Sequence, residues 1–581
     1  MSLPKDITSW IMSMNDKKST TERTVSREVC DWITDQGIFH VFIVPGLQIE
    51  HLVWEIAQTK ALRSIYGCHE LGTGFMADGY SRVSGKPGIS ISIGGPGAAY
   101  MLASSIVSRV DDSSVLYITG DVSTAYKNRF CFQDTGMYGT RDREGYKALV
   151  DFSEAILAPG DAAGVLGRIA YQLGRKLPAH LAIPSDIQKG NVSADSAMAA
   201  SSDGVAPQVD HHHDADTVAG VLVNAIGESR NPVILAGHRV SFNNGEESLR
   251  SFIDATGIAV ATTYSAKGVV PEDHPLSLGI FGYAGTRRSF EAILLNDCDL
   301  LIILGADLSE RNTLGFDRRF LPDARKCIYI DTKKQREDPE WNGSERFVVR
   351  DIAGVLRSAR TQYGSTGKKR YLPSPVVSAD AGLAETPASD NAVMTLESAI
   401  RLLHGILPPE TLCFVDSGAH RVVAAHAWLA TEPGTFFTSS QVAPMGWAIC
   451  AAIGAKLARP GSPVVVITGD GCMRMHGMEI ATAVRYRLPI LYLVSNNCSY
   501  SVLKQRASAR FGETDIGYLP LIDWSGFARS IGAEGCVVTD EKEMDPVFER
   551  AKMAKGPFII DFRMQTAETL SCEITIPERA Y

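Results

Sequence analysis

Residues 463–500 read PVVVITGDGCMRMHGMEIATAVRYRLPILYLVSNNCSY. Two aliphatic runs, 464–468 and 490–494, are bounded by Pro, Gly and polar residues, a pattern typical of buried parallel strands. Residues 476–487 between them fit a crossover helix. Both strands of such a unit end at the same edge of the sheet, where open α/β sheets bind ligands. The stretch therefore predicts a ligand site at the carboxyl edge of a parallel sheet.

Polar residues follow both predicted strands. Asp470 comes after the first strand, and Asn496 and Asn497 come after the second. If the two strands are neighbours, one cation could contact both loops. A carboxylate, an amide oxygen and a backbone carbonyl just beyond form a hard oxygen set that suits Mg²⁺ shared with phosphate oxygens. Because Gly469 and Gly471 would let the backbone approach an anion closely, we expect a magnesium and diphosphate site.

Length and composition exclude several classes of protein. The 581 residues are enough for about three or four domains. A net charge of -9 gives no electrostatic footprint for nucleic acid, so we expect no DNA or RNA partner. The longest apolar runs fall short of the roughly 20 residues that a membrane helix needs, so we expect no membrane partner and a cytoplasmic protein. Eleven cysteines without a CxxC pair fit reduced thiols.

Three segments of the chain alternate apolar strands with helical patterns, namely 24–190, 217–360 and 391–565. Between them, residues 191–216 and 361–390 are rich in small and polar residues and predict linkers. The tetrapeptide ITGD occurs at 118–121 in the first segment and at 467–470 in the third. This hints at a repeated architecture.

The spacing of the opening stretch resembles a known family. Gly469-Asp470-Gly471, then residues 472–495, then Asn496-Asn497, is similar to the thiamine diphosphate motif of the pyruvate decarboxylase and acetolactate synthase superfamily. The resemblance implies thiamine diphosphate and Mg²⁺ as cofactors. It also implies three doubly wound α/β domains with parallel sheets, which are pyrimidine-binding, middle and diphosphate-binding in chain order. The implied metal ligands are Asp470, Asn497 and Ser499.

Residues 67–82, GCHELGTGFMADGYSR, resemble the HEQ, AA, GYAR pattern of the same superfamily, with Leu71 where Gln is usual. The resemblance implies that Glu70 hydrogen-bonds N1′ of the cofactor's aminopyrimidine and so makes the 4′-imino group a base. That base removes the proton from thiazolium C2. The alternative is an ordinary carboxylate that the dipole of a helix N-terminus favours.

Residues 439–456, SSQVAPMGWAICAAIGAK, resemble the segment that precedes the metal motif in acetolactate synthases. There Met445 would bend the cofactor, although Met as core filler is the alternative. The carbonyl of Ala443 would accept from the 4′-amino group, at a position where the family often has Gly. Cys472 replaces a common Ser. The full set of implied cofactor contacts is Glu70, Pro45, Gly95, Gly418, Ala419, His420, Ala443, Met445, Gly469, Asp470, Gly471, Cys472, Asn497, Ser499 and Tyr500.

The substrate loops depart from the family. Leu47-Gln48 stands where acetolactate synthases have Gly-Gly, and the two-His motif of pyruvate decarboxylases is absent around 109–114. Gln133, after Phe132, lies where relatives place a substrate-side amide. The resemblance implies Glu70, Gln133 and His420 as catalytic residues, and the implied substrate residues are Leu47, Gln48, Phe132 and Gln133.

Residues 265–279, SAKGVVPEDHPLSLG, resemble the middle domain of acetolactate synthase-like proteins, and some relatives hold FAD there. Arg287, Arg288 and Arg311 could meet its phosphates, but surface charge also explains them. No decisive motif is present, so FAD is possible but is not favoured.

The resemblance covers nearly the whole chain. It implies a carbon–carbon lyase or ligase that decarboxylates a 2-oxo acid and transfers the enamine to a second carbonyl. The alternatives are a decarboxylase that protonates the enamine, a cyclic diketone hydrolase, an FAD-linked 2-oxo acid oxidase and a non-enzymatic scaffolding subunit. Because Glu70 and Asp470 lie in different domains, family precedent implies active sites at the subunit interface of a homodimer or homotetramer.

Overall fold

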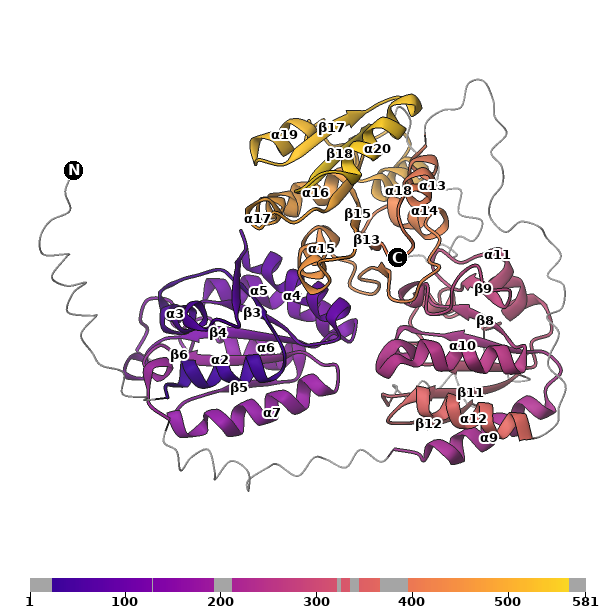
Figure 1. The fold of residues 1–581 in the computed structure, drawn as a ribbon, viewed down its shortest axis with the longest axis horizontal. Coiled ribbons are helices and arrows are strands. Elements are labelled where there is room, and N and C mark those ends of the chain that lie inside the picture. The colour runs from indigo at the N-terminus through magenta and orange to yellow at the C-terminus, as the bar shows by residue number, and fades with distance from the viewer. Residues whose placement is uncertain are drawn as a thin grey trace, which may run out of the picture.

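The computed structural model describes residues 23–127, 129–192, 212–320, 325–334, 344–365 and 395–563. These residues form three six-stranded parallel sheets with flanking helices (Figure 1). The predicted α/β fold class is therefore confirmed. The expected linkers 191–216 and 361–390 lie largely outside the described residues.

The first sheet has the strand order β2-β1-β3-β4-β6-β5. Its central strands are buried along their whole length, because helices cover both faces. The strands are β1 (His40–Ile43), β2 (Arg63–Tyr66), β3 (Gly88–Ser92), β4 (Val115–Asp121), β5 (Ser153–Ala155) and β6 (Ala179–Pro184). The helices are α2 (Val25–Asp35), α3 (Glu50–Gln58), α4 (Glu70–Ser84), α5 (Pro96–Val110), α6 (Asp142–Val150) and α7 (Ala162–Gly174).

The second sheet has the order β12-β11-β10-β7-β8-β9, which in chain order is the doubly wound arrangement 6-5-4-1-2-3. One apolar cluster lies on each of its faces. The strands are β7 (Pro232–Ala236), β8 (Ala259–Thr262), β9 (Ser277–Ile280), β10 (Leu300–Leu304), β11 (Lys326–Asp331) and β12 (Ser344–Val348). The helices are α9 (Ala215–Glu228), α10 (Gly245–Thr256), α11 (Arg287–Phe290) and α12 (Ile352–Ser365).

The third sheet has the order β14-β13-β15-β16-β18-β17, the same as the first. Its strands are β13 (Leu412–Val415), β14 (Phe436–Phe437), β15 (Val464–Gly469), β16 (Leu491–Asn496), β17 (Glu534–Val538) and β18 (Phe558–Arg563). Its helices are α13 (Leu396–Ile406), α14 (His420–Ala427), α15 (Trp447–Ala458), α16 (Asp470–His476), α17 (Ile480–Arg485), α18 (Ser501–Phe511), α19 (Trp524–Ser530) and α20 (Met544–Lys552).

The first and third sheets thus repeat one architecture, but the ITGD tetrapeptide does not mark the repeat. Residues 118–121 lie on β4, the fourth strand of its sheet in chain order, whereas 467–469 lie on β15, the third strand of its own. The strand that corresponds to β4 is β16. The repeat consists in the strand order that the two sheets share. The ITGD tetrapeptide lies on strands that do not correspond to each other.

The expected crossover helix at 476–487 was wrong in its bounds. Helix α16 begins at Asp470, and a 3-10 turn at Gly477–Glu479 separates it from α17. A carboxylate in the first helical turn is favoured by the helix dipole, so Asp470 begins the helix instead of lying in a loop before it. The expectation that the two flanking strands are neighbours is confirmed, since β15 and β16 pair in parallel from Val465 with Leu491 to Gly469 with Ser495.

Helices α4 and α15 join the first and third sheets through very close backbone contact (Figure 1). A Cβ on Gly79 would lie 2.0 Å from the carbonyl oxygen of Ala451, and one on Gly454 would lie 1.8 Å from that of Met76. A single apolar cluster runs from the first sheet through these helices into the third. The two units are therefore packed as one body.

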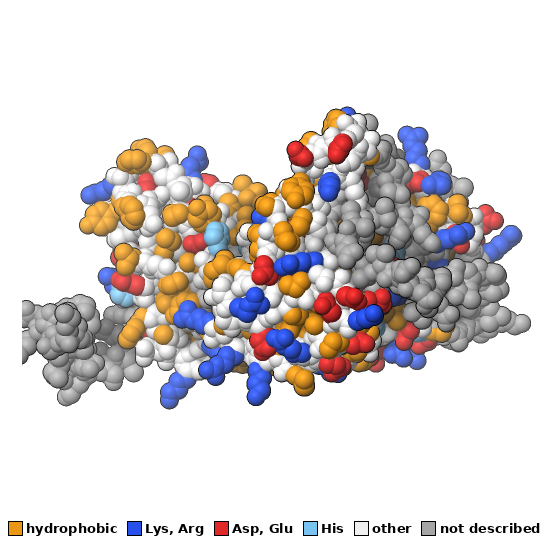
Figure 2. Space-filling view, turned by 90° about the horizontal axis from the view of Figure 1, so that it is seen from above, with side chains coloured by type: hydrophobic (Ala, Val, Ile, Leu, Met, Phe, Trp, Pro, Cys, Tyr) orange, Lys and Arg blue, Asp and Glu red, His pale blue; other side chains and the backbone are white. Residues whose placement is uncertain are grey.

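The molecular surface shows no segregation of charge on the face seen in Figure 2, where acidic, basic and apolar side chains are interspersed. Within the described ranges, every helix is too short or too polar to cross a bilayer.

Candidate functional site

Three adjacent strands of the third sheet end in polar residues. Strands β13, β15 and β16 are neighbours and parallel, so their carboxyl ends lie at one edge. Asp416 follows β13, Asp470 follows β15, and Asn496 ends β16. The predicted ligand edge is thus assembled from loops that are far apart in the sequence.

Asp470 carries a buried carboxylate oxygen that is an unsatisfied hydrogen-bond acceptor among the residues that the structure describes. Backbone N–H groups of Gly471 and Ser499 donate to the carboxylate, yet Oδ2 is buried and has no hydrogen-bond partner within the described residues. Burial raises the pKa of Asp470 to about 6, despite those hydrogen bonds and the charge of Arg474. A bound cation would satisfy such an oxygen and favour the ionised form.

The loop after β16 brings the other predicted ligands to Asp470. Ser499 Oγ donates to Asn497 Oδ1 at 3.0 Å, and Asn497 Nδ2 donates to Ser501 Oγ at 2.6 Å. Asn496 points elsewhere, because its amide donates to Asp561 Oδ1 at 2.7 Å. Asn497 rather than Asn496 is therefore the residue of the pair that lies with the site.

The acidic ligand set is sparse. No group of three or more His, Cys, Asp or Glu side chains suited to a metal occurs in the described part of the chain. The predicted set has one carboxylate, one amide oxygen and one carbonyl, so it belongs to the class in which phosphate oxygens complete the shell.

His420 opens α14 and lies against two glycines. Its imidazole is so close that a Cβ on Gly418 would lie 2.5 Å from Cε1, and one on Gly469 would lie 3.0 Å from it. Burial and the charge of Arg421 lower the pKa of His420 to about 3, so the ring is neutral. Nε2 is buried without a partner among the described residues. Ala419 precedes it as the N-cap of α14.

Met445 and Tyr500 converge on Gly471. A Cβ at Gly471 would lie 2.6 Å from Tyr500 Cε1 and 2.9 Å from Met445 Cε, so only glycine fits there. Ala443 adopts φ +52°, a left-handed conformation that glycine adopts more easily, which accounts for the Gly that the family often has at this position. Cys472 is buried, and its thiol donates to the carbonyl of Ser417 at 3.1 Å.

Asp416 connects the loop before α15 to strand β15 through its side chain. No role for this residue was predicted from the sequence. Its Oδ1 accepts from the backbone N–H of Gly446 at 2.8 Å, and its Oδ2 accepts from Thr468 Oγ1 at 3.0 Å. Burial raises the pKa of Asp416 to about 6. Its place directly after a predicted strand was a signal that could have found it.

Glu70 begins α4, directly after the loop that follows β2. His69 is the N-cap, and its side chain accepts from the backbone N–H of Leu71. Glu70 Oε2 lies 4.0 Å from His69 Nδ1, and Oε1 lies 3.2 Å from where a Cβ of Gly97 would be. The carboxylate is largely buried and stands at the carboxyl edge of the first sheet.

The other loops of that edge are tied together by Gln48. Its Oε1 accepts from the backbone N–H of Gly94 at 2.7 Å, and its Nε2 donates to the carbonyl of Gln133 at 3.3 Å. Gln133 and Gly95 both have positive φ. The structure therefore brings Gln48 and Gln133 together with Gly95, and Pro45 lies just before this loop.

The apolar substrate candidates face outward in the single chain. Leu47 is 82% exposed and Phe132 is 86% exposed.

Asp142, which the sequence did not single out, accepts from the N–H of Gly95 at 2.8 Å. Burial raises the pKa of Asp142 to about 6. No sequence pattern marks this residue, because it opens a helix far along the chain from Gly95.

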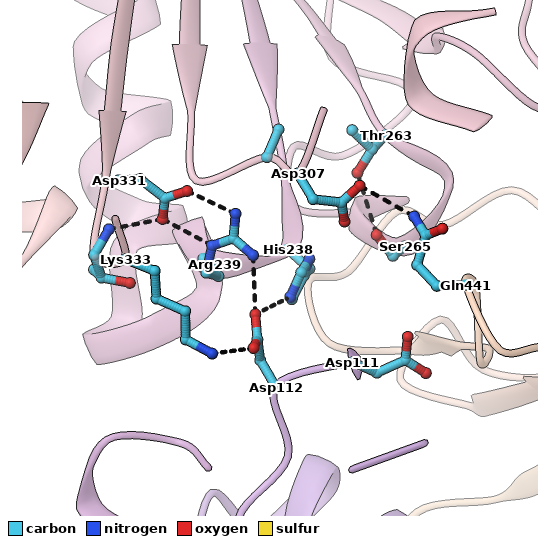
Figure 3. A network of polar contacts seen from close by, with 12 residues as sticks. Asp111, Asp112, His238, Arg239, Thr263, Ser265, Asp307, Asp331, Lys333 and Gln441 are labelled. Carbon is cyan, nitrogen blue, oxygen red and sulfur yellow. Dashed lines mark hydrogen bonds and ion pairs between the residues drawn. The ribbon is translucent and has the colours of Figure 1, made fainter. Parts of the chain in front are cut away.

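The carboxyl edge of the middle sheet is occupied by the chain's own side chains (Figure 3). Arg239, after β7, donates from Nε and Nη2 to Asp331 at the end of β11 at 2.7 and 2.6 Å. Its Nη1 donates at 2.9 Å to Asp112, which comes from the first unit and also contacts His238 and Lys333. Burial opposes ionisation of Asp112, but the hydrogen bond from His238 and the charges of Lys333 and Arg239 hold its pKa well below the usual range.

The turns after β7 and β10 close on each other at the point where the strand order reverses. Gly237 donates to Leu304 O at 2.8 Å, and a Cβ on Gly237 would lie 2.2 Å from Ala306 Cα. Nearby, Gln441 of the third unit donates to Asp307 Oδ1 at 3.0 Å (Figure 3). This edge joins all three units through polar contacts.

Two of the arginines that were considered for FAD, Arg287 and Arg311, have partners within the chain. Arg287 pairs with Glu291 at 2.7 Å on an exposed helix. Arg311 Nη1 donates to the carbonyl of Ser440 at 3.0 Å, and its guanidinium lies over the ring of Tyr283. Neither contact points to a phosphate.

Comparisons with known proteins agree with this geometry. Three domain families match the chain, described as thiamine pyrophosphate enzyme N-terminal TPP binding domain (residues 23–141), central domain (221–358) and C-terminal TPP binding domain (416–562). Thiamine pyrophosphate is another name for thiamine diphosphate.

Several acetolactate synthases are similar over most of their length. The "Probable acetolactate synthase large subunit" of Methanocaldococcus jannaschii is 29% identical over 86% of this chain and 85% of its own. The "Acetolactate synthase" of Mycobacterium bovis is 28% identical over 93% and 88%. The "Acetolactate synthase isozyme 1 large subunit" of Escherichia coli is 27% identical over 96% and 97%. The chain belongs to the thiamine pyrophosphate enzyme family, as an acetolactate synthase-like enzyme that depends on thiamine diphosphate.

Proposed function

We propose that Asp470, Asn497 and the backbone carbonyl of Ser499 hold Mg²⁺, which binds the diphosphate of the cofactor. The observation that carries this assignment is the buried Oδ2 of Asp470, which has no partner among the described residues, on a carboxylate that accepts from the backbone N–H of Ser499. Oxygen ligands of this kind suit Mg²⁺. The residues that would contact the diphosphate are Gly418, Ala419, His420, Gly469, Gly471, Cys472 and Tyr500. The close packing of His420 against Gly469 and of Tyr500 against Gly471 supports this set.

The reactive end of the cofactor would meet Glu70, Met445 and Ala443. When bound, thiamine diphosphate supplies a carbon nucleophile that can also accept the electron pair released by decarboxylation. Glu70 would hold a proton at pyrimidine N1′. The carbonyl of Ala443 would accept from the 4′-amino group, and Met445 would pack under the bend between the two rings. Pro45 and Gly95 would line the pyrimidine side.

The proposed reaction is decarboxylation of a 2-oxo acid and joining of the remaining fragment to a second carbonyl, as in the acetolactate synthases to which the chain is similar. Leu47, Gln48, Phe132 and Gln133 would select the substrates, and neutral His420 would serve as a hydrogen-bonding group near the reacting atoms. A 2-oxo acid decarboxylase that only protonates the intermediate and a cyclic diketone hydrolase would use the same cofactor residues.

We further propose that each active site is shared between two chains of a homodimer or homotetramer. Asp470 lies at the start of α16, a seven-residue helix about 10 Å long, whereas the segment before Glu70 contacts Glu479 beyond its far end. In one chain, the segment that holds Glu70 and the residue Asp470 thus lie at opposite ends of that helix.

The proposed domains are 24–190, 217–360 and 391–565, and the proposed location is cytoplasmic.

Exposed apolar side chains at both halves support this sharing, since a second copy would cover them. In the first unit they are Leu47, Tyr126, Phe130, Phe132, Met137 and Tyr138. In the third unit they are Val502, Leu503, Phe511, Ile516, Tyr518 and Leu521.

We propose that the reaction does not use FAD. Open α/β sheets bind dinucleotides at the switch point beyond the strand ends. Here that edge is filled by the paired Arg239 and Asp331 and is closed by Gly237. The absorption spectrum of the purified protein, before and after incubation with FAD and gel filtration, tests this. Retention of flavin at one per chain would favour the oxidase, and its complete removal would support the proposal.

A screen of 2-oxo acids tests the reaction, with mass spectrometry of products in the presence and absence of added aldehydes. A product that contains carbons of both the oxo acid and the acceptor supports the ligase. An aldehyde as the sole product, whatever the acceptor, would assign a simple decarboxylase. Ring opening of a cyclic diketone without loss of CO2 would assign the hydrolase.

A further inference from the structure

We propose that Glu479 is a positioning residue for Glu70. Glu479 lies within the thiamine diphosphate motif of the third unit, between Gly471 and Asn496, whereas Glu70 lies in the first unit. The inference rests on the proposed function, because it concerns how Glu70 is aimed at the pyrimidine.

The carboxylate of Glu479 accepts hydrogen bonds from the backbone just before Glu70. Oε2 accepts from the N–H of Cys68 at 3.1 Å, and Oε1 accepts from the N–H of His69 at 2.9 Å. A third hydrogen bond comes from Thr482 Oγ1 to Oε2 at 3.0 Å. Two consecutive backbone donors on one carboxylate fix the direction in which the chain enters α4. Glu70 is the next residue.

The surroundings of Glu479 match this task. The residue is 1% exposed, and its carboxylate accepts hydrogen bonds from Cys68, His69 and Thr482. A buried carboxylate is costly unless hydrogen bonds of this kind stabilise it. Burial raises the pKa of Glu479, against the lowering effect of those donors.

The first unit is shaped to receive this side chain. Gly72, in the first turn of α4, has so little space that a Cβ would lie 2.2 Å from Glu479 Oε1 and 2.6 Å from Cδ. Gly67, on the other side, would place a Cβ 3.5 Å from Oε2. The carboxylate therefore lies against two glycines, Gly67 and Gly72, that flank the short segment containing Glu70.

A second contact fixes the same segment from the third unit. Tyr486 OH accepts from the N–H of Tyr66 at 2.8 Å and donates to the carbonyl of Ser64 at 3.1 Å. Tyr486 thus holds the end of β2, and Glu479 holds the turn into α4. Of these two contacts, the one made by Glu479 is adjacent to the activating carboxylate.

The variant Glu479→Gln keeps the shape but replaces one acceptor with a donor, so it opposes one of the two backbone N–H groups. Amide hydrogen exchange of residues 66–72 in cofactor-free protein should accelerate about tenfold, and C2–H exchange of bound thiamine diphosphate should slow by about tenfold or more. Cofactor affinity should change less than about threefold, since the anchoring half is intact. Glu549→Gln, an exposed glutamate on α20, is the matched control.

Two milder variants keep the test decisive if Glu479→Gln folds poorly. Thr482→Val removes one of the three hydrogen bonds to the Glu479 carboxylate. Gly72→Ala adds a methyl group on α4 that contacts the same carboxylate and displaces it. Both should move amide exchange and C2–H exchange in the same direction as Glu479→Gln. Wild-type rates in all three variants would overturn the proposal.

A double variant separates positioning from general stability. If Glu479 acts through Glu70, then Glu70→Gln with Glu479→Gln should show C2–H exchange no slower than Glu70→Gln alone. A further loss in the double variant would contradict the proposal. Normal C2–H exchange in Glu70→Gln would instead overturn the proposed thiamine mechanism, so the two failures are distinguishable.

Discussion

Gly454 of α15 packs directly against the carbonyl of Met76 in α4. A Cβ on Gly454 would lie 1.8 Å from that oxygen. The two helices therefore approach each other at backbone distance, and they do so within a continuous apolar core. This contact sets the relation between the unit that holds Glu70 and the unit that holds Asp470.

Gly454→Ala should destabilise the protein by about 1–3 kcal/mol, because the added methyl must separate two packed helices. Alanine would otherwise favour a helix by about 1 kcal/mol. Gly167→Ala is the matched control, since Gly167 is an exposed helical glycine and a Cβ added there would have no heavy atom within 4 Å. Chemical denaturation measures both. Equal stability of the two variants would contradict the close contact.

Asp470→Ala should lose Mg²⁺ and thiamine diphosphate together, because the metal bridges the protein and the diphosphate. Isothermal titration of Mg²⁺ with the cofactor measures the loss, which we expect to exceed about a hundredfold in affinity. Asp515→Ala, which alters a carboxylate in the loop after α18, serves as the control. Unchanged affinity in Asp470→Ala would remove the metal role from this residue.

Asp142 should make stability depend on pH. Its pKa is raised from 3.8 to about 6, chiefly by burial, so between these values the folded state holds a proton that the unfolded state has lost. The stabilisation is fully present below the unfolded pKa and is lost as the pH rises through 6. Asp142→Asn cannot lose that proton, so its advantage over the natural protein should grow over this window, to at most about 3 kcal/mol.

Denaturation midpoints at pH values from about 4 to 7 measure this slope for Asp142→Asn. Glu144→Gln, which alters an exposed acid on the same helix whose charge adds to the raised pKa of Asp142, should change the slope much less than Asp142→Asn does. The same slope in the natural protein and in Asp142→Asn would show that another group carries the pH dependence.

Local patterns predicted the strands and the class of fold. The apolar runs at 464–468 and 490–494 indicated β15 and β16 within two residues of their bounds, and the paired ends of these strands followed from the rule that parallel strands share an edge. The helix after β15 was misplaced, because Asp470 was interpreted as a turn residue rather than as the start of a helix. Sequence letters do not show which of these two roles an acidic residue takes.

Contacts between distant segments could not be predicted. Asp112 pairs with Arg239 across 127 residues, and Glu479 binds the backbone of Cys68 and His69 across 411 and 410 residues, in both cases between separate units. Neither pair has a spacing that periodicity would reveal. The positive φ of Ala443 accounts for the Gly that the family often has there, but only the backbone geometry shows it.

The central claim is that Glu70 activates a thiamine cofactor anchored at Asp470. Hydrogen–deuterium exchange at C2 of bound thiamine diphosphate in Glu70→Gln tests it most directly, beside cofactor affinity measured on the same samples. We expect near-normal affinity with exchange slowed by about a hundredfold or more, since a neutral amide cannot hold the proton at N1′. Exchange at the natural rate, with the cofactor bound, would contradict it.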